Sequence, residues 1–246
     1  MTIAIPAPVQ AVFTTFPLQT FPAVPARDTA LEAELGRRTF AFGKHASSND
    51  AAPFTLVAAH RPVSVALDGA TVQLCSAPAE LFVQLCLCHK NALALPREAQ
   101  EGCAAIPSPH KVLVAARAGA PELLLNGRLV ARDELLRGLA ARLPGVHRQL
   151  SQLLDRDLAP LFAGGYVSPG VVRRATQTLR QFEQLAQGGD SSPYLEMKVA
   201  SYVLVLLHVV AEGEAADLRE CREFVQGECP ALVEGAYTVL RRLSGK

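Results

Sequence analysis

The stretch PAELFVQLCLCHKN, residues 78 to 91, constrains the fold of this chain more than any other part of its sequence. Pro78 suits the first position of a helix, and Glu80 suits its first turn, where the helix dipole favours an acidic side chain. His89 and Lys90 suit the last turn for the complementary reason. The predicted helix is apolar on nearly every face. Such a helix must be buried on two sides, so other elements have to cover it.

The segments on both sides of this predicted helix are expected to form short strands. A hairpin is expected at 63 to 67 and 71 to 75, where two such runs flank Asp68-Gly69. A second hairpin is expected around Asn126-Gly127, the strongest short hairpin signal in a sequence. Further strands are predicted at 93 to 96 and 111 to 118, and a helix from Asp133 that stops at Pro144-Gly145. The order of strand, buried helix, strand, hairpin and helix is that of a thioredoxin-like domain.

After residue 146 the spacing of leucines predicts helices alone. Helices are expected from Val146 to Leu158, from Ser168-Pro169 to Gly188-Gly189, from Ser192-Pro193, and over 216 to 226 and 230 to 243. The expected domains are therefore an extended Pro/Phe-rich arm and linker over 1–53, with a short helix around Leu31 and Leu35, a thioredoxin-like domain over 54–145 and an all-helical domain over 146–246. The fold class is α/β plus all-α.

Composition limits the partners. The net charge is +1, and no dense run of Lys or Arg occurs, so the sequence predicts no binding to nucleic acid. The first basic residue is Arg27, which argues against a secretory signal and a cleaved mitochondrial presequence. The chain is therefore expected on the cytosolic side, with its six cysteines as reduced thiols.

The cluster Cys86, Cys88 and His89 raises the question of a metal site. Two cysteines at i and i+2 project about 200° apart on a helix and cannot share one ion. Cys86 and His89 share a face, but zinc prefers four ligands and no second pair of suitable spacing occurs. We expect buried packing thiols, no metal and no cofactor.

Cys75 and Ser76 occupy the only position where a catalytic nucleophile could lie, between a strand and the start of the buried helix. The favoured interpretation is a strand-end thiol and a helix-flanking serine. No C-x-x-C motif follows Cys75, which disfavours thiol–disulfide exchange. A glutathione-dependent transferase would also need an anion-binding turn before the last helix of the domain. That turn contains Asp133 and Glu134 beside Arg132, and its two carboxylates would repel the substrate carboxylate. The sequence predicts neither an enzyme nor a small-molecule substrate.

The most hydrophobic segment, VASYVLVLLHVVA at 199 to 211, invites a transmembrane reading. Its 13 residues would span only about 20 Å of a hydrocarbon core of about 30 Å. A central helix of the C-terminal domain explains the segment better.

Four stretches resemble the metaxin family, and within it the small receptor subunit of the fungal mitochondrial sorting and assembly machinery (SAM/TOB complex). They are FPLQTF (16–21), LFVQLCLCHKNALALP (81–96), SPYLEMKVASYVLVLLHV (192–209) and FVQGECPALVE (224–234). The resemblance implies a glutathione-transferase-like fold without enzymatic activity. It also implies a peripheral protein on the cytosolic face of the mitochondrial outer membrane. The implied partners are a β-barrel insertase, a second metaxin-like subunit and β-barrel precursor proteins. The alternatives are a glutathione-dependent transferase and a cytosolic scaffold.

No span of about 20 apolar residues, polybasic stripe or lipidation signal is found in the sequence. Membrane attachment is therefore expected to come through protein contacts. Aromatic and aliphatic side chains of the proline-punctuated arm are candidates for part of this contact, because such a segment gains by burying them. They are Val12, Phe13, Phe16, Leu18 and Phe21. Packing of the arm on its own domain is the alternative.

Overall fold

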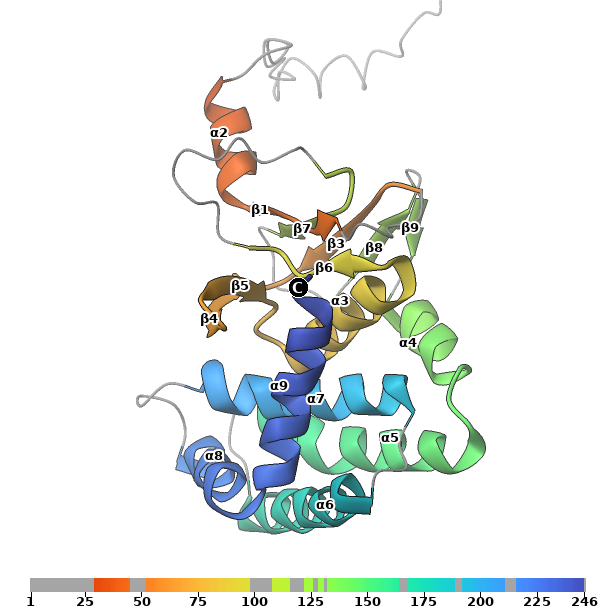
Figure 1. Cartoon of the computed structure of the whole chain (residues 1–246), viewed down its shortest axis with the longest axis vertical. Helices are drawn as coiled ribbons and strands as arrows, with labels where there is room; N and C mark the ends of the chain where they lie inside the picture. Colours follow the sequence, from red (N-terminus) through yellow and green to blue (C-terminus); the bar gives the residue numbers. More distant parts are fainter. Residues whose placement is uncertain are drawn as a thin grey trace, which may run out of the picture. The chain divides into compact units, whose positions relative to one another are not determined.

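The computed structural model describes residues 29–44, 52–97, 108–115, 122–125, 128–130, 132–163, 168–188, 192–210 and 216–245. The chain divides into two units, Met1–Arg37 and Arg38–Lys246. In the first unit the described element is α2 (Thr29–Arg37), which confirms the helix expected around Leu31 and Leu35. All elements named below belong to the second unit, the body (Figure 1).

A five-stranded sheet has the strand order β1-β7-β3-β8-β9. Its strands are β1 (Thr39–Ala41), β3 (Phe54–Ala58), β7 (Lys111–Val114), β8 (Glu122–Leu125) and β9 (Arg128–Val130). The pair β3–β7 is parallel, and the helix α3 (Pro78–Asn91) lies between these strands in the chain. The pairs β1–β7, β3–β8 and β8–β9 are antiparallel. The predicted mixture of strands and helices is confirmed.

Three strands of the body were missed by sequence reasoning. The strand β3 (FTLVA) lies in the middle of the sheet and carries Phe54 and Leu56 into the core. The strand β2 (Gly43–Lys44) pairs with β6 (Leu93–Ala94), and β1 precedes it. The arm and linker expected over 1–53 therefore do not extend through 39–41 and 43–44, which pair with strands of the body. These strands have two to five residues, too few to show a clear period in the sequence.

The first predicted hairpin is present as β4 (Val63–Leu67) and β5 (Ala70–Leu74), which form a separate two-stranded sheet. Its turn places Asp68 at φ 47° and Gly69 at φ 81°, the pair of positive φ values that a type I′ turn requires. The hairpin lies in the chain between β3 and α3. The run 71 to 75 therefore pairs with β4 in a separate sheet, and β3 is the strand of the five-stranded sheet that precedes α3 in the chain.

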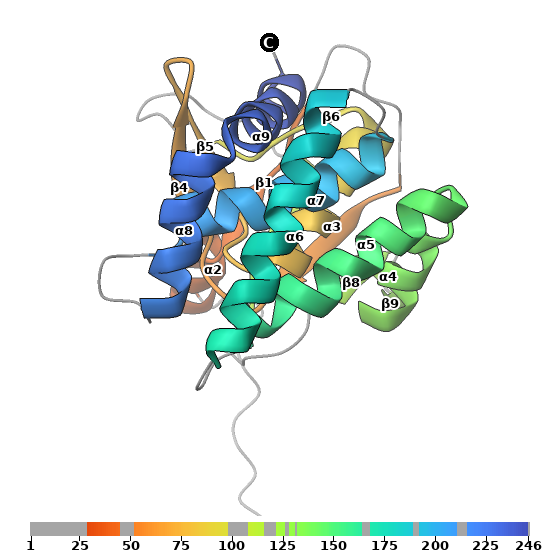
Figure 2. The same ribbon diagram turned by 90° about the horizontal axis from the view of Figure 1, so that it is seen from below.

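The second half of the body is helical in all its described elements, as predicted. They follow α4 (Arg132–Ala140), the last helix of the first half, and are α5 (Gly145–Leu158), the 3₁₀ turn η1 (Ala159–Phe162), α6 (Pro169–Gly188), α7 (Pro193–His208), α8 (Ala216–Glu228) and α9 (Pro230–Leu243). The side-chain oxygen of Ser192 accepts a hydrogen bond from the Leu195 amide at 3.3 Å, which confirms the predicted start of α7. The helices α3 and α7 pack against each other, and α7 also packs against α9 (Figures 1 and 2).

The end of α9 contacts the half of the body that contains the sheets. The Leu95 amide donates to the Leu243 carbonyl at 2.9 Å, and the Arg97 guanidinium donates to the Ser244 carbonyl. Arg241 of α9 reaches Asp68 in the turn of the β4–β5 hairpin at 3.8 Å. The two halves of the body thus share backbone hydrogen bonds as well as a packed core.

Candidate functional site

The position at which a transferase would need its nucleophile holds a buried thiol. Cys75 follows β5 and is fully buried, with its amide donating to the side-chain oxygen of Gln84 at 2.9 Å. Burial raises the pKa of the Cys75 thiol well above its ordinary value, and the nearby Glu80 and Cys88 raise it further. A buried thiol with a raised pKa is a poor nucleophile.

The carboxylate subsite of a transferase was expected at the start of the helix after the second hairpin. That helix, α4, begins at Arg132, one residue before the predicted start. Glu134 is exposed in its first turn, while the side chains of Arg132 and Asp133 lie outside the described residues. Ser76 is half-buried before α3.

Cys86 and Cys88 are buried in α3, as predicted from its apolar faces. Burial is the main cause that raises the pKa of both thiols above the ordinary value. The ring of His89 lies edge-on to Tyr194 with their centroids 5.8 Å apart. Burial and Arg242 lower the pKa of His89, although Glu196 opposes this. Within the described ranges no group of three or more His, Cys, Asp or Glu side chains could hold a metal ion.

The segment 199 to 211 forms most of α7, whose side chains from Ala200 to Leu206 are all buried. This confirms a central helix in the helical half. Among the described residues, no helix combines the length and the apolar character that crossing a membrane would need.

Sequence reasoning missed two buried polar groups of α3. The Oε1 atom of Glu80 accepts from the Ala59 amide at 2.8 Å, just after β3. Gln84 accepts from Cys75 and donates to the Gln73 carbonyl at 3.0 Å. Buried polar groups persist where they satisfy backbone partners. These two side chains therefore anchor the backbone just before and just after the β4–β5 hairpin. A polar residue in an otherwise apolar helix was the signal.

A third buried polar group, Lys198, joins three helices. Its Nζ atom lies 2.7 Å from Oδ1 of Asp155 on α5, 4.7 Å from the ring centre of Phe82 on α3 and 5.6 Å from that of Tyr202. The Tyr202 hydroxyl donates to the same Asp155 oxygen at 2.8 Å. The ammonium group is thus held by one carboxylate and two aromatic faces, which makes it a structural link.

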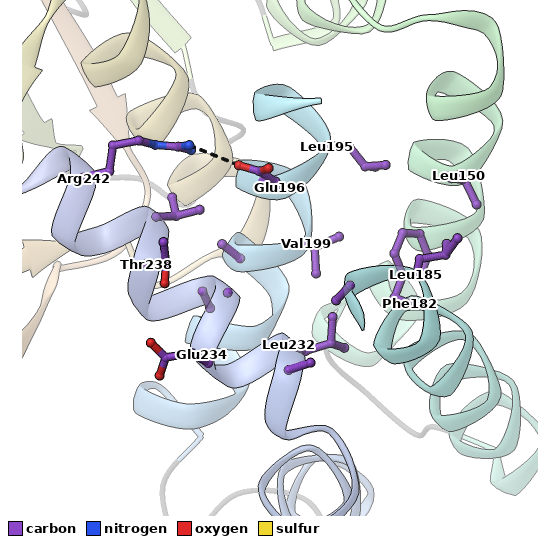
Figure 3. A pocket seen from close by; sticks show the side chains of 16 residues that line it. Leu150, Phe182, Leu185, Leu195, Glu196, Val199, Leu232, Glu234, Thr238 and Arg242 are labelled. Carbon is purple, nitrogen blue, oxygen red and sulfur yellow. Dashed lines mark hydrogen bonds and ion pairs between the residues drawn. The ribbon is translucent and has the colours of Figure 1, made fainter. Parts of the chain in front are cut away.

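The helical half contains an apolar groove of about 370 Å³ among α5, α6, α7 and α9 (Figure 3). Leu150, Phe182 and Leu185 line it from one side, and Leu195 and Val199 of α7 line its floor. The fourth side is α9, which presents the small residues Ala231, Gly235 and Thr238, with Glu234 among them. At one end Arg242 donates to Glu196 at 3.2 Å.

A hydrogen-bonded cap lies beside this groove, at the start of α9. Glu183 of α6 accepts from the amides of Ala231 and Leu232 at 3.0 and 2.9 Å, so it caps α9 from another helix. Among the described residues, the charged side chains that line the groove are the paired Glu196 and Arg242, and Glu234, which pairs with Arg241 at 2.7 Å. The lining formed by the described residues therefore suits an apolar side chain.

The arm residues proposed as a partner contact, Val12, Phe13, Phe16, Leu18 and Phe21, lie outside the described residues. Their role stays a prediction.

Comparison with known proteins covers the N-terminal half. Residues 3–122 match the family model described as SAM35, subunit of the SAM complex. Over 122 residues the chain is 34% identical to the sorting assembly machinery 35 kDa subunit of Saccharomyces cerevisiae. The predicted family resemblance is confirmed there. The alignment takes in 48% of this chain and 36% of the yeast protein, so the similar region is about a third of that relative. The stretches at 192–209 and 224–234 lie outside the matched range.

Proposed function

We propose that this chain is a non-enzymatic peripheral subunit of the mitochondrial outer-membrane machinery that assembles β-barrel proteins. In this role it helps to recognise and insert β-barrel precursors, bound to a β-barrel insertase and a second metaxin-like subunit. One observation carries the proposal: residues 3–122 match the SAM35 family model, and a yeast subunit of the sorting assembly machinery is 34% identical to this half.

We further propose a glutathione-transferase-like fold. The order β7-β3-β8-β9, the parallel β3–α3–β7 connection, the antiparallel β8–β9 hairpin and the following α4 support a thioredoxin-like first half. The helices from α5 onward support a helical second half. The division into domains over 54–145 and 146–246 belongs to this proposal, with β1 and β2 added to the first.

The lack of an enzymatic role is part of the proposal. Its support is the state of Cys75, whose thiol is buried and has a raised pKa at the place where a transferase needs a reactive group. No observation favours the alternatives, a glutathione-dependent transferase or a cytosolic scaffold. A saturable glutathione turnover that disappears in Cys75→Ala or Ser76→Ala would contradict the proposal.

The proposed location is the cytosolic face of the mitochondrial outer membrane. Copurification tests it together with the partners: the tagged full chain is isolated from mitochondria in mild detergent, and bound proteins are identified by mass spectrometry. We expect an outer-membrane β-barrel insertase in stoichiometric amount. Recovery of the chain from the cytosolic fraction, with no outer-membrane protein bound, would contradict the proposal.

A deletion of residues 1–26 separates the two roles considered for the arm. Loss of the insertase from the purified complex, with an unchanged melting temperature of the purified chain, would support docking through the Phe-containing arm. A collapsed melting temperature would show that the arm is part of the fold.

A further inference from the structure

The connection between α4 and α5 carries basic side chains and no carboxylate. Residues 135 to 154 contain Arg137, Arg142 and Arg148 and no Asp or Glu. The sequence pattern did not show a basic patch, because these arginines are five or six positions apart. The structure folds them onto the end of α4, the turn at 141–144 and the first turn of α5.

The turn at 141–144 is anchored by a buried residue, and its other side chains are exposed. Leu143 is buried in the core, and the Arg148 guanidinium donates to the Leu143 carbonyl at 3.4 Å. Around this anchor Arg142, Pro144 and Arg148 are exposed. In both Figure 1 and Figure 2 the α4–α5 connection lies at the outer edge of the body, so a flat surface could meet it.

The same connection carries the most exposed large apolar side chain among the described residues. Val146 is 69% exposed at the start of α5. Leu150, one helical turn later, lies on the same face and lines the mouth of the apolar groove beside Leu185, which is 43% exposed (Figure 3). An apolar strip thus runs from the exposed tip toward the groove.

Some of the exposed arginines elsewhere in the body have carboxylate neighbours. Arg241 pairs with Glu234 and Arg242 with Glu196. Arg219 of α8 stands in a helix with Asp217, Glu220 and Glu223. Within the described part of the chain, Arg142 and Arg148 form none of the ion pairs found. Their charge is therefore available to an external anion.

We propose that the α4–α5 corner, defined by Arg142, Val146 and Arg148, docks on the surface of an anionic phospholipid bilayer. The two guanidinium groups would meet phosphate and carboxylate groups of the lipid headgroups, while Val146 enters the interface between headgroups and acyl chains. Basic and apolar side chains together are the combination that interfacial binding uses. This contact adds a lipid partner to the protein partners proposed above, and its argument does not depend on them.

Flotation of the purified full chain with lipid vesicles tests the proposal. We expect binding to vesicles of phosphatidylcholine mixed with phosphatidylserine, weaker binding in high salt, and little binding to phosphatidylcholine alone. The double variant Arg142→Glu/Arg148→Glu should weaken binding at least about 25-fold, or about fivefold for each lost positive charge. Val146→Asp tests the apolar part of the contact, because it keeps both arginines, and it should also weaken vesicle binding.

The matched control is Arg173→Glu/Arg219→Glu, which changes the net charge by the same amount at exposed positions of α6 and α8. It should bind as the unmodified chain does, and melting temperatures should show that all variants are folded. Equal losses in both double variants would overturn the proposal in favour of nonspecific attraction. Failure of the unmodified chain to bind anionic vesicles would also overturn it. If, in that case, Arg142→Glu/Arg148→Glu also lost the insertase in the copurification, we would conclude that the corner binds an acidic protein surface and not lipid.

The two proposals fail separately. Vesicle binding that depends on the corner, without any copurified insertase, would contradict the proposed function alone. A recovered insertase, without vesicle binding, would contradict the lipid contact alone.

Discussion

The helices α3 and α7 are the two most apolar helices in the core, and they pack against each other, yet they use their buried polar residues differently. In α3, Glu80 and Gln84 bind backbone groups beside β3 and β5. In α7, Lys198 binds side chains from α3 and α5. The sheet half thus uses buried polar groups to fix an irregular backbone, whereas the helical half uses one to link helices.

This difference has an energetic consequence. When a side chain that binds buried backbone is removed, the backbone groups lose their partners inside the protein and cannot reach water. When Lys198 is removed, its carboxylate partner Asp155 remains half-exposed and is hydrated. We therefore expect substitutions in the sheet half to cost more than the corresponding change in α7.

The largest loss of stability is expected from a charge placed in the core around α7. Leu204 of α7 is 1% exposed, so Leu204→Arg would place an unpaired charge in the interior. We expect a loss of at least about 4 kcal/mol in the free energy of unfolding, measured by urea denaturation. Leu185→Arg, at an exposed site on α6, is the control and should change stability by less than about 1 kcal/mol. An unchanged stability in Leu204→Arg would mean that α7 is not a core helix.

Next in size is Gln84→Leu, which preserves the approximate volume but removes both hydrogen bonds to the hairpin. We expect a loss of about 2–4 kcal/mol, because the Cys75 amide and the Gln73 carbonyl lose a buried partner. Hydrogen exchange should quicken in β5 more than in α6. The exposed Gln181→Leu serves as the matched control. Equal stability of the two variants would remove the proposed role of Gln84.

These sites show what the sequence could and could not predict. The helix 78–91 and the Asp68-Gly69 hairpin were predicted because their signals are local, an apolar surface and a turn with positive φ. The strand β3 was missed because five residues do not define a period, and it becomes a central strand only through pairing with β7 and β8. Gln84 was missed because its partners lie nine and eleven residues away in the chain. The groove was missed because four helices supply its walls.

A smaller effect is expected for Lys198→Met. The thioether side chain fills similar space, and the lost ion pair leaves only a half-exposed carboxylate. We expect a loss of about 1–2 kcal/mol in the free energy of unfolding, with Lys111→Met, exposed on β7, as the control. A loss larger than that of Gln84→Leu would reverse the comparison between the two halves.

The smallest effect is expected from the pH dependence of the α5–α6 contact. Hydrogen bonds from Arg156 and Thr178 lower the pKa of Asp157, although burial opposes them. A pKa below the unfolded value stabilises the fold above the unfolded pKa, and this contribution is lost as pH falls through the folded pKa. Thr178→Val should therefore lose less stability than the unmodified chain between neutral pH and about pH 3, by under about 1 kcal/mol. Identical acid dependence would contradict this role of Thr178.

The central claim, a part in β-barrel assembly, is tested most directly by the assembly of a radiolabelled β-barrel precursor in mitochondria depleted of this chain. The account predicts that the precursor crosses into the organelle but fails to reach its assembled form in native electrophoresis, and that resupplying the chain restores assembly. A matrix-targeted precursor should be imported normally in the same mitochondria. Normal assembly of the β-barrel precursor after full depletion would contradict the account.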